Sequence, residues 1–235
     1  MPSAADLRKL GRDALTGNWL LAVFITLLAA LLGGISYFSF GSVSADHVMY
    51  WSVSTRVFFS LYGIFVFIIG GAVELGLCCF YIHLQRQEEI SVSDLFSRFS
   101  IFGRAFLLRL YIFILVLLWT LLLIIPGIVA AYRYAMAPYL MSQNPELEVM
   151  QAVDISKRMM NGHKGRLFCL DLSFIGWFIL GVLTFGLGLL FVFPYLLSSR
   201  AAFFLDLRYH YQEERGGDAA TKPASASTAD QAPIH

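Results

Sequence analysis

Long apolar runs separated by short polar segments set the pattern of this 235-residue chain. A membrane-spanning helix needs about 20 apolar residues at a rise of about 1.5 Å per residue, and the first two runs have that length. Two later runs, 106–141 and 167–205, are too long for one straight span, and each contains a break. The pattern therefore predicts an all-α, polytopic transmembrane helical bundle with six spans, at about 19–38, 57–82, 106–125, 127–141, 167–183 and 187–205.

The break in the third run is Pro126-Gly127. This pair is either the turn of a tight hairpin or a kink in one long helix. A single crossing would put the basic segments that end at Arg104 and begin at Lys157 on opposite sides of the membrane. Two crossings put both on one side, as the positive-inside rule favours. The last run breaks in a similar way at 184–188, so we expect three hairpins.

The basic residues also give the orientation. Of the 17 Lys and Arg residues, 13 fall in segments that this topology places on one side, three (Arg109, Arg133 and Arg200) lie within spans, and Arg56 lies on the other side. An excess of Lys and Arg marks the cytoplasmic side, so we expect both termini in the cytoplasm. The basic residues are spread over several loops rather than gathered on one element, which argues against nucleic acid as a partner.

Composition agrees with a membrane protein and disfavours a soluble one. Apolar residues make up 58% of the chain and charged residues 14%, against about 45–50% and about 25% in soluble domains. Arg8, Lys9 and Arg12 ahead of the first run resemble a signal peptide with a cleavage site at 43–45, but the run exceeds the roughly 7–15 apolar residues of such a signal. We expect a retained first helix, a single membrane domain over 1–210, and a disordered cytoplasmic tail over 211–235.

Three polar segments on the expected cytoplasmic side have the pattern of short interfacial helices. The first carries Leu7 and Arg8 just ahead of the first span. The second opens with a capping box at Ser91–Asp94. The third begins at Asn144-Pro145 and stops at Asn161-Gly162. Such helices either lie in the headgroup layer, with Lys and Arg toward anionic lipid, or pack on the end of the bundle.

Ionisable residues within spans are costly to bury and are candidates for function. Glu74 is the clearest, about 12 Å from the cytoplasmic end of its span. Its expected partner in a buried ion pair is Arg133 or Arg200; alternatively, these groups line a polar pocket for a headgroup, a proton or a small solute. The intramembrane candidates are Glu74, Arg133, Asp171 and Arg200, and the headgroup-level candidates are Lys164 and Arg166.

Asp171 is expected near the N-terminus of the fifth spanning helix, where the helix dipole favours a carboxylate. Lys164 and Arg166 precede it at headgroup depth. Asp171 can pair with them and seal the inner face of the bundle, or a lipid phosphate can bind there.

The sequence contains no G-x-S-x-G, H-E-x-x-H or Walker motif. Cys78, Cys79 and Cys169 lie in apolar runs, without the Cys or His spacing of a metal site, and are interpreted as buried small hydrophobes. We therefore expect no enzymatic activity, no metal and no cofactor. Small residues at four-residue spacing, such as Ala29 and Gly33, permit close contact between helices.

Several segments resemble a bacterial membrane-protein family, the domain-of-unknown-function family 975. The similar segments are Ile125-Pro126-Gly127-Ile128, Tyr132 to Tyr139, Ala152 to Lys164, Leu170-Asp171-Leu172-Ser173-Phe174-Ile175-Gly176-Trp177, Phe193-Pro194-Tyr195 and, earlier, Ala14 to Trp19. The resemblance covers about 6–210 and implies a multi-span protein of the bacterial inner (plasma) membrane without an assigned catalytic activity. A more distant similarity is to the membrane portion of some glycerophosphodiester phosphodiesterases; this chain lacks their catalytic domain, so that activity is not carried over.

These features lead to one expectation and one alternative. The expectation is a non-enzymatic, multi-span integral membrane protein that acts through contacts with membrane lipids or with a membrane-protein partner. The alternative is a small transporter or channel with a polar path through Glu74, Arg133 and Arg200.

Overall fold

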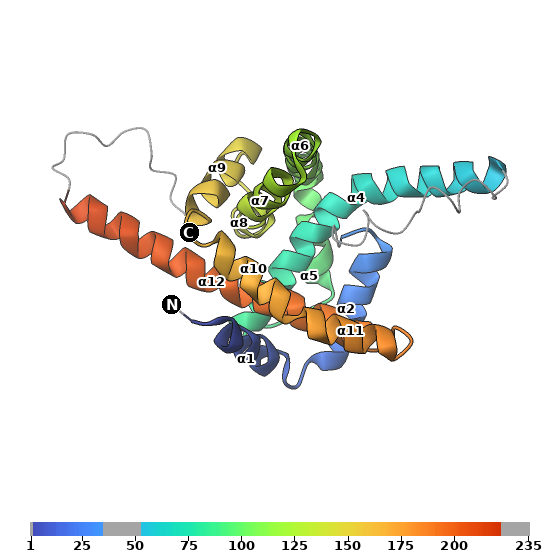
Figure 1. The fold of residues 1–235 in the computed structure, drawn as a ribbon, viewed down its shortest axis with the longest axis horizontal. Coiled ribbons are helices and arrows are strands. Elements are labelled where there is room, and N and C mark those ends of the chain that lie inside the picture. Colours follow the sequence, from blue (N-terminus) through green and yellow to red (C-terminus); the bar gives the residue numbers. More distant parts are fainter. Residues whose placement is uncertain (1, 35–52, 222–235) are drawn as a thin grey trace.

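The computed structural model describes residues 2–34 and 53–221, and Figure 1 shows their arrangement. Within these residues the chain is all-helical, without a strand. The elements are α1 (Ala4–Leu15), α2 (Trp19–Leu31), α4 (Val53–Gln85), α5 (Ser93–Phe96), the 3₁₀ helix η2 (Ser97–Ile101), α6 (Phe102–Leu122), α7 (Ile124–Tyr134), α8 (Ala137–Gln143), α9 (Val149–Met159), α10 (Lys164–Ser173), α11 (Ile175–Leu183) and α12 (Leu189–Thr221). The all-α class predicted from the sequence is confirmed.

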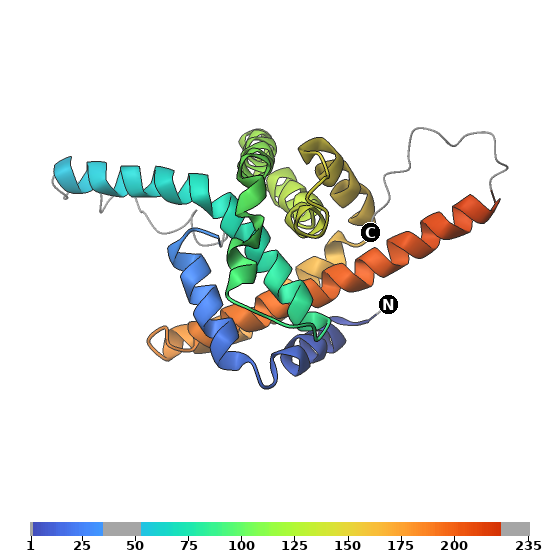
Figure 2. The ribbon, with the colours of Figure 1, turned by 180° about the vertical axis from the view of Figure 1, so that it is seen from behind.

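The centre of the molecule is the crossing of α4 and α12, against which α1 packs (Figures 1 and 2). Gly11 of α1 lies directly on Ser199 of α12: a Cβ at Gly11 would be 2.9 Å from the Ser199 nitrogen. Ser198 Oγ donates a hydrogen bond to the Gly11 carbonyl at 2.9 Å, and Gln85 Nε2 of α4 donates to the Ser198 carbonyl at 2.9 Å. The close approach and these two bonds fix α1, α4 and α12 to one another.

Helices α6 and α7 pack against each other after a sharp reversal of the chain. The break lies at Leu123, whose backbone is extended (φ −163°, ψ 141°). Pro126, the predicted turn residue, instead falls in the first turn of α7, where a backbone N–H has no partner within the helix and proline is tolerated. The reversal therefore precedes Pro126-Gly127. The last long run breaks after Leu183, and α12 begins at Leu189, as expected from 184–188.

Four helical segments of the described chain are long and apolar enough to cross a membrane: Leu61–Gln85, Ser93–Leu122, Lys164–Leu183 and Leu189–Glu213. A fifth results if α1 and α2, which meet at 102°, are taken as one broken span. The chain thus has the helices of a membrane protein. The expected span 127–141 is not among them; it is divided between α7 and α8. The expected first span, 19–38, extends past Gly34 and so beyond the described residues.

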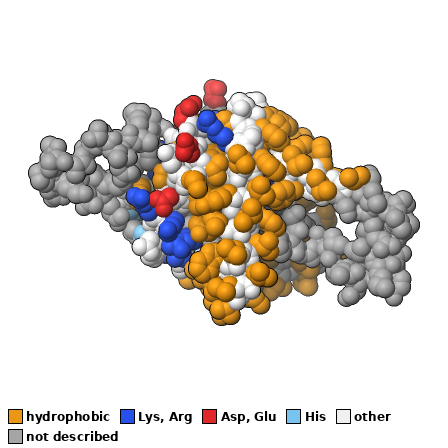
Figure 3. Space-filling view, turned by 90° about the horizontal axis from the view of Figure 1, so that it is seen from above, with side chains coloured by type: hydrophobic (Ala, Val, Ile, Leu, Met, Phe, Trp, Pro, Cys, Tyr) orange, Lys and Arg blue, Asp and Glu red, His pale blue; other side chains and the backbone are white. Residues whose placement is uncertain are grey.

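Apolar side chains are exposed on the parts of the molecule that lie away from this centre. Residues 121–125, around the α6–α7 break, are 63–83% exposed, and most of the large apolar residues of α11 are also exposed. Figure 3 shows a face covered by hydrophobic side chains, with charged side chains gathered along one edge. Large exposed apolar faces are rare on soluble proteins, so these faces agree with the membrane-spanning length of the helices.

The interfacial helices differ in detail from their predicted form. α1 has the capping box that its sequence allows, between Ser3 and Asp6. The segment after Ser91 forms the short α5 and η2 before α6 starts. Helix α9 begins at Val149, with Glu148 and Gln151 as the capping box, so its predicted start at Asn144-Pro145 is wrong.

The C-terminal helix is longer than expected. α12 continues through Pro194 to Thr221, so the first part of the segment 211–235, predicted to be a disordered tail, is helical. The rest of that segment, 222–235, lies outside the described residues.

Candidate functional site

A cavity of about 440 Å³ lies between α4, α6 and α7, with Pro138 of α8 at one wall. Its lining is mainly apolar and includes Phe67, Leu108 and Tyr134. Glu74 of α4 and Arg109 of α6 also line the cavity. A largely apolar cavity with a few convergent polar groups is the usual form of a ligand site.

The Arg109 side chain is the centre of the polar contacts in this cavity. Its Nη1 lies 3.9 Å from Glu74 Oε2 and donates a hydrogen bond to the Gly33 carbonyl, at the end of α2, at 2.8 Å. The guanidinium also lies over the Phe67 ring, 5.4 Å from the centroid. The side chain is only 9% exposed. These contacts offset the cost of holding a charge in an apolar environment.

Gly70 makes this arrangement possible. A Cβ at this position of α4 would lie 2.9 Å from the Gly33 carbonyl carbon, and closer still to the Gly33 oxygen and to Arg109 Nη1. Gly70 also precedes Glu74 by four residues, which puts both on one face of α4. The missing side chain thus leaves the room in which α2, α4 and α6 meet at Arg109.

A second polar cluster joins α7, α10 and α12. Arg200 Nε donates to Asp171 Oδ1 at 2.9 Å, and Arg200 Nη2 donates to Asp171 Oδ2, so the pair is bidentate. Tyr132 Oη donates to Asp171 Oδ2 at 2.9 Å. Arg200 is 6% exposed. The structure therefore brings together two of the residues predicted from the sequence.

Asp171 is stabilised differently from the way that the sequence indicated. The expected fifth helix divides into α10 and α11, and Asp171 falls near the end of α10 rather than near a helix N-terminus. Its carboxylate is held by Arg200 and Tyr132, not by the dipole. Arg166, one of its expected partners, donates instead to Asp206 Oδ2 at 2.9 Å and to the Pro2 carbonyl at 3.0 Å.

Two other predicted residues, Arg133 and Lys164, are not part of the cavity lining. Arg133 is at the end of α7; its carbonyl accepts a hydrogen bond from Ser156 at 3.0 Å, and its Nε is buried without a hydrogen-bond partner in the described part of the chain. Lys164 is the first residue of α10 and is half-buried. Glu74 pairs with Arg109, which lies within the expected span 106–125, and not with Arg133 or Arg200 as predicted.

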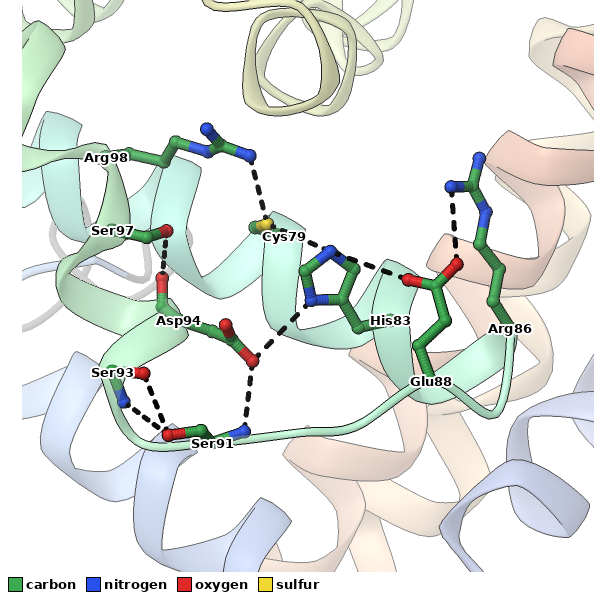
Figure 4. A network of polar contacts seen from close by, with 9 residues as sticks. All are labelled: Cys79, His83, Arg86, Glu88, Ser91, Ser93, Asp94, Ser97 and Arg98. Atoms are coloured by element: carbon green, nitrogen blue, oxygen red, sulfur yellow. Dashed lines mark hydrogen bonds and ion pairs between the residues drawn. The ribbon is translucent and has the colours of Figure 1, made fainter.

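A third polar network closes the connection between α4 and α5 (Figure 4). His83 Nε2 lies 3.6 Å from Cys79 Sγ, and His83 Nδ1 lies 3.6 Å from Asp94 Oδ2. Arg98 Nη2 donates to Cys79 Sγ at 3.4 Å. Cys79, predicted to be a plain buried hydrophobe, is thus part of a polar network.

A thiol, an imidazole and a carboxylate in this order have the composition of a nucleophilic catalytic site. Cys79 is only 1% exposed, however, so the path by which a substrate would reach its sulfur is blocked. The described residues also contain no group of three or more His, Cys, Asp or Glu side chains that could hold a metal ion. We interpret this network as one that holds α5 against α4.

The chain matches the sequence model of one family, described as a protein of unknown function (DUF975), over residues 1–129 and 120–210. No curated protein and no solved structure matches the chain.

Proposed function

Because the chain belongs to the DUF975 family, whose function is unknown, we propose its role from its own residues. It is a non-enzymatic integral membrane protein that binds a lipid-like molecule in the cavity between α4, α6 and α7. The observation that carries this proposal is the ion pair of Glu74 and Arg109 on the wall of an apolar cavity of about 440 Å³.

The proposed topology has six spans in three hairpins. The packing of α6 on α7 and of α11 on α12 supports the last two hairpins, with α8 completing the return of the chain after α7. The basic residues of α1 and α9 support a location of both termini in the cytoplasm, with the protein in the bacterial inner membrane. Residues 121–125 then form the tip of a hairpin on the outer side.

The cavity fits a ligand from the membrane rather than one from water. Much of the surface of α6 is exposed, and Phe113, which lines the cavity, is 38% exposed. A ligand would therefore enter from the lipid side. The volume lies in the range of roughly 300–1,000 Å³ that is typical of small-molecule sites.

The ion pair also defines the polar group of the ligand. The charges of Glu74 and Arg109 compensate each other, so a charged headgroup would leave one charge unpaired in an apolar setting. An uncharged hydroxyl or ester can donate to the carboxylate or accept from the guanidinium without that cost. The proposed ligand is thus an uncharged amphiphile with an apolar chain.

The alternative, transport along a path through Glu74, Arg133 and Arg200, is less well supported. Arg200 is 6% exposed and held by both oxygens of Asp171. Glu74 lines the cavity described above, whereas Arg133 and Arg200 are not part of its lining. A fixed ion pair stabilises the bundle, whereas conduction requires a group that can exchange partners.

Native mass spectrometry of the protein released from mild detergent tests the binding proposal. We expect wild type to retain one uncharged lipid, and Glu74→Gln to lose it. Glu89→Gln is the matched control, because Glu89 is exposed on the loop after α4. A protein that retains no lipid, or retains it equally in Glu74→Gln, would overturn the proposal; a protein that copurifies in place of lipid would point to a partner role.

A second variant leaves the ion pair intact. Ala131→Phe fills the cavity from α7, whereas Ile128→Phe adds a ring on the same helix outside the lining. The proposal requires loss of the lipid in the first variant and retention in the second, at equal melting temperatures. Equal retention in both would place the lipid elsewhere.

A further inference from the structure

A second groove, of about 340 Å³, runs along the hairpin of α11 and α12. Near the turn it is lined by Thr184 and Gly188, and at its other end by Trp177 and Tyr195. From Trp177 to Thr184 the groove follows α11 for about 10 Å, at about 1.5 Å per residue. Its wall is almost wholly apolar, and the charged residue on its rim is Arg12 of α1.

The Tyr195 end of the groove is basic. Arg8 and Arg12 are four residues apart on α1 and therefore lie on one face. Arg12 lines the groove together with Tyr195, and Arg8 lies one helical turn before Arg12 on α1. The packing of Gly11 on Ser199 holds α1, and with it both arginines, against α12. The basic end is thus positioned by the fold and not by a mobile loop.

These arginines have hydrogen-bond donors to spare. The Nε of Arg8 is buried and has no hydrogen-bond partner among the residues that the structure describes. In the same part of the chain, the Arg12 guanidinium has one ion-pair contact, to Asp13 at 4.0 Å, and both side chains of that pair are more than half exposed. Such an exposed pair is weak. An anion with several acceptor oxygens, such as a phosphodiester, would satisfy these donors.

Aromatic side chains flank the basic end of the groove. Trp19 lines the groove and packs on Phe191, and Trp177 packs edge-on against Tyr195 with the ring centroids 6.2 Å apart. Tryptophan is favoured at the boundary between headgroups and hydrocarbon. Toward the turn, Val182 and Leu183 of α11 are 65% and 77% exposed, as residues that face acyl chains would be.

From this combination we propose that the groove binds an anionic phospholipid. Its phosphate lies between Arg8, Arg12 and the Tyr195 hydroxyl, and one acyl chain fills the groove between α11 and α12. The site is separate from the cavity at Glu74, and it requires a negative headgroup where the cavity requires an uncharged one. An inorganic phosphate would satisfy the arginines but leave the apolar groove unfilled, which is why the proposal commits to a lipid.

The experiment is a titration of the full chain in mild detergent with phosphatidylglycerol or phosphatidylcholine, followed by native mass spectrometry. Wild type should bind one phosphatidylglycerol tightly and phosphatidylcholine weakly. Arg8→Gln/Arg12→Gln should weaken phosphatidylglycerol binding about tenfold or more, the effect of losing charge-assisted hydrogen bonds. Lys9→Gln, on the same helix and exposed, is the matched control and should change it less than about twofold.

The acyl-chain part of the proposal has its own pair of variants. Leu180→Trp fills the groove, whereas Ile179→Trp adds the same ring on the neighbouring, non-lining position of α11. The first should lower phosphatidylglycerol affinity and the second should not.

Equal losses of phosphatidylglycerol affinity in Lys9→Gln and in the arginine variants would show general charge attraction, and would overturn the proposed site. If inorganic phosphate displaced the lipid and Leu180→Trp had no effect, the proposed binding of the acyl chain in the groove would be overturned. Glu74→Gln should leave phosphatidylglycerol binding unchanged, so the two proposals can fail separately.

Discussion

Replacing Gly70 with alanine should destabilise the protein although alanine favours a helix. The new Cβ would lie 2.9 Å from the carbonyl carbon of Gly33 and closer still to its oxygen and to Arg109 Nη1. The arginine tip could move, but the Gly33 carbonyl belongs to the backbone at the end of α2 and cannot yield without shifting that helix. The hydrogen bond from Arg109 to Gly33 would be lost in either case.

The magnitude follows from three contributions. Overpacking of this kind costs about 1–3 kcal/mol, and loss of a hydrogen bond from a charged group costs about 1.5–3 kcal/mol. The helix gains about 0.5–1 kcal/mol from alanine in place of glycine. The net loss is about 2–5 kcal/mol, and about 2–4 °C of melting temperature per kcal/mol for a chain of this size gives a fall of at least about 4 °C.

Gly63→Ala is the matched control. It lies on the same helix, and a Cβ there would meet no atom within 4 Å. This variant should keep only the gain in helix propensity, so its melting temperature should equal or exceed that of wild type. The assay is thermal unfolding of both variants in one detergent, followed by circular dichroism. A Gly70→Ala protein as stable as Gly63→Ala would refute the role assigned to the contact between α2, α4 and α6.

Three further predictions concern other parts of the fold. Asp171→Asn should lower stability in detergent by about 3–5 kcal/mol, because Arg200 would remain buried without its carboxylate; an unchanged melting temperature would contradict this. Gly11→Ala should separate α1 from α12 and accelerate hydrogen exchange in α1, whereas Gly165→Ala, with open space around it, should not. Hydrogen bonds from Ser3 lower the pKa of Asp6 below its ordinary value of 3.8, so its contribution to α1 is fully present well above pH 3.8 and is lost as the pH falls from there through the lowered pKa. Amide protection factors in the first turn of α1, measured across that range, check this; protection independent of pH would contradict it.

The sequence was most informative where apolar runs are long. The helical class and the break at 184–188 follow directly from such runs. The break near Pro126 was placed too late, because proline fits the first turn of a helix as well as it fits a turn. The start of α9 was placed too early for a related reason: both Asn144 and Glu148 can cap a helix, and local sequence does not rank them.

The partners of the buried charges could not be read from the sequence. Asp171 and Arg200 were both named as candidates, but their pairing depends on how α10 meets α12. Arg109 gave only a weak signal in the sequence: it lies in the span expected at 106–125, but about 4–5 Å from the cytoplasmic end, whereas Glu74 lies about 12 Å from the end of its own span. The groove of Arg12 had no signal in the sequence, since its lining comes from α1 and α2 near one end of the chain and from α11 and α12 near the other.

The packing of α1 on α12 has a consequence for biosynthesis. Gly11 and Ser198, which are joined by a hydrogen bond, are separated by 187 positions in the chain. At about 5–20 residues per second, a ribosome needs roughly 10–40 s to make that length. During this interval the apolar face of α1, with Leu7 and Leu15, is already synthesised while its partner does not yet exist. An amphipathic helix can bury its apolar face at the membrane surface, so α1 would bind there first. Its packing against α12 would then be one of the last steps of assembly.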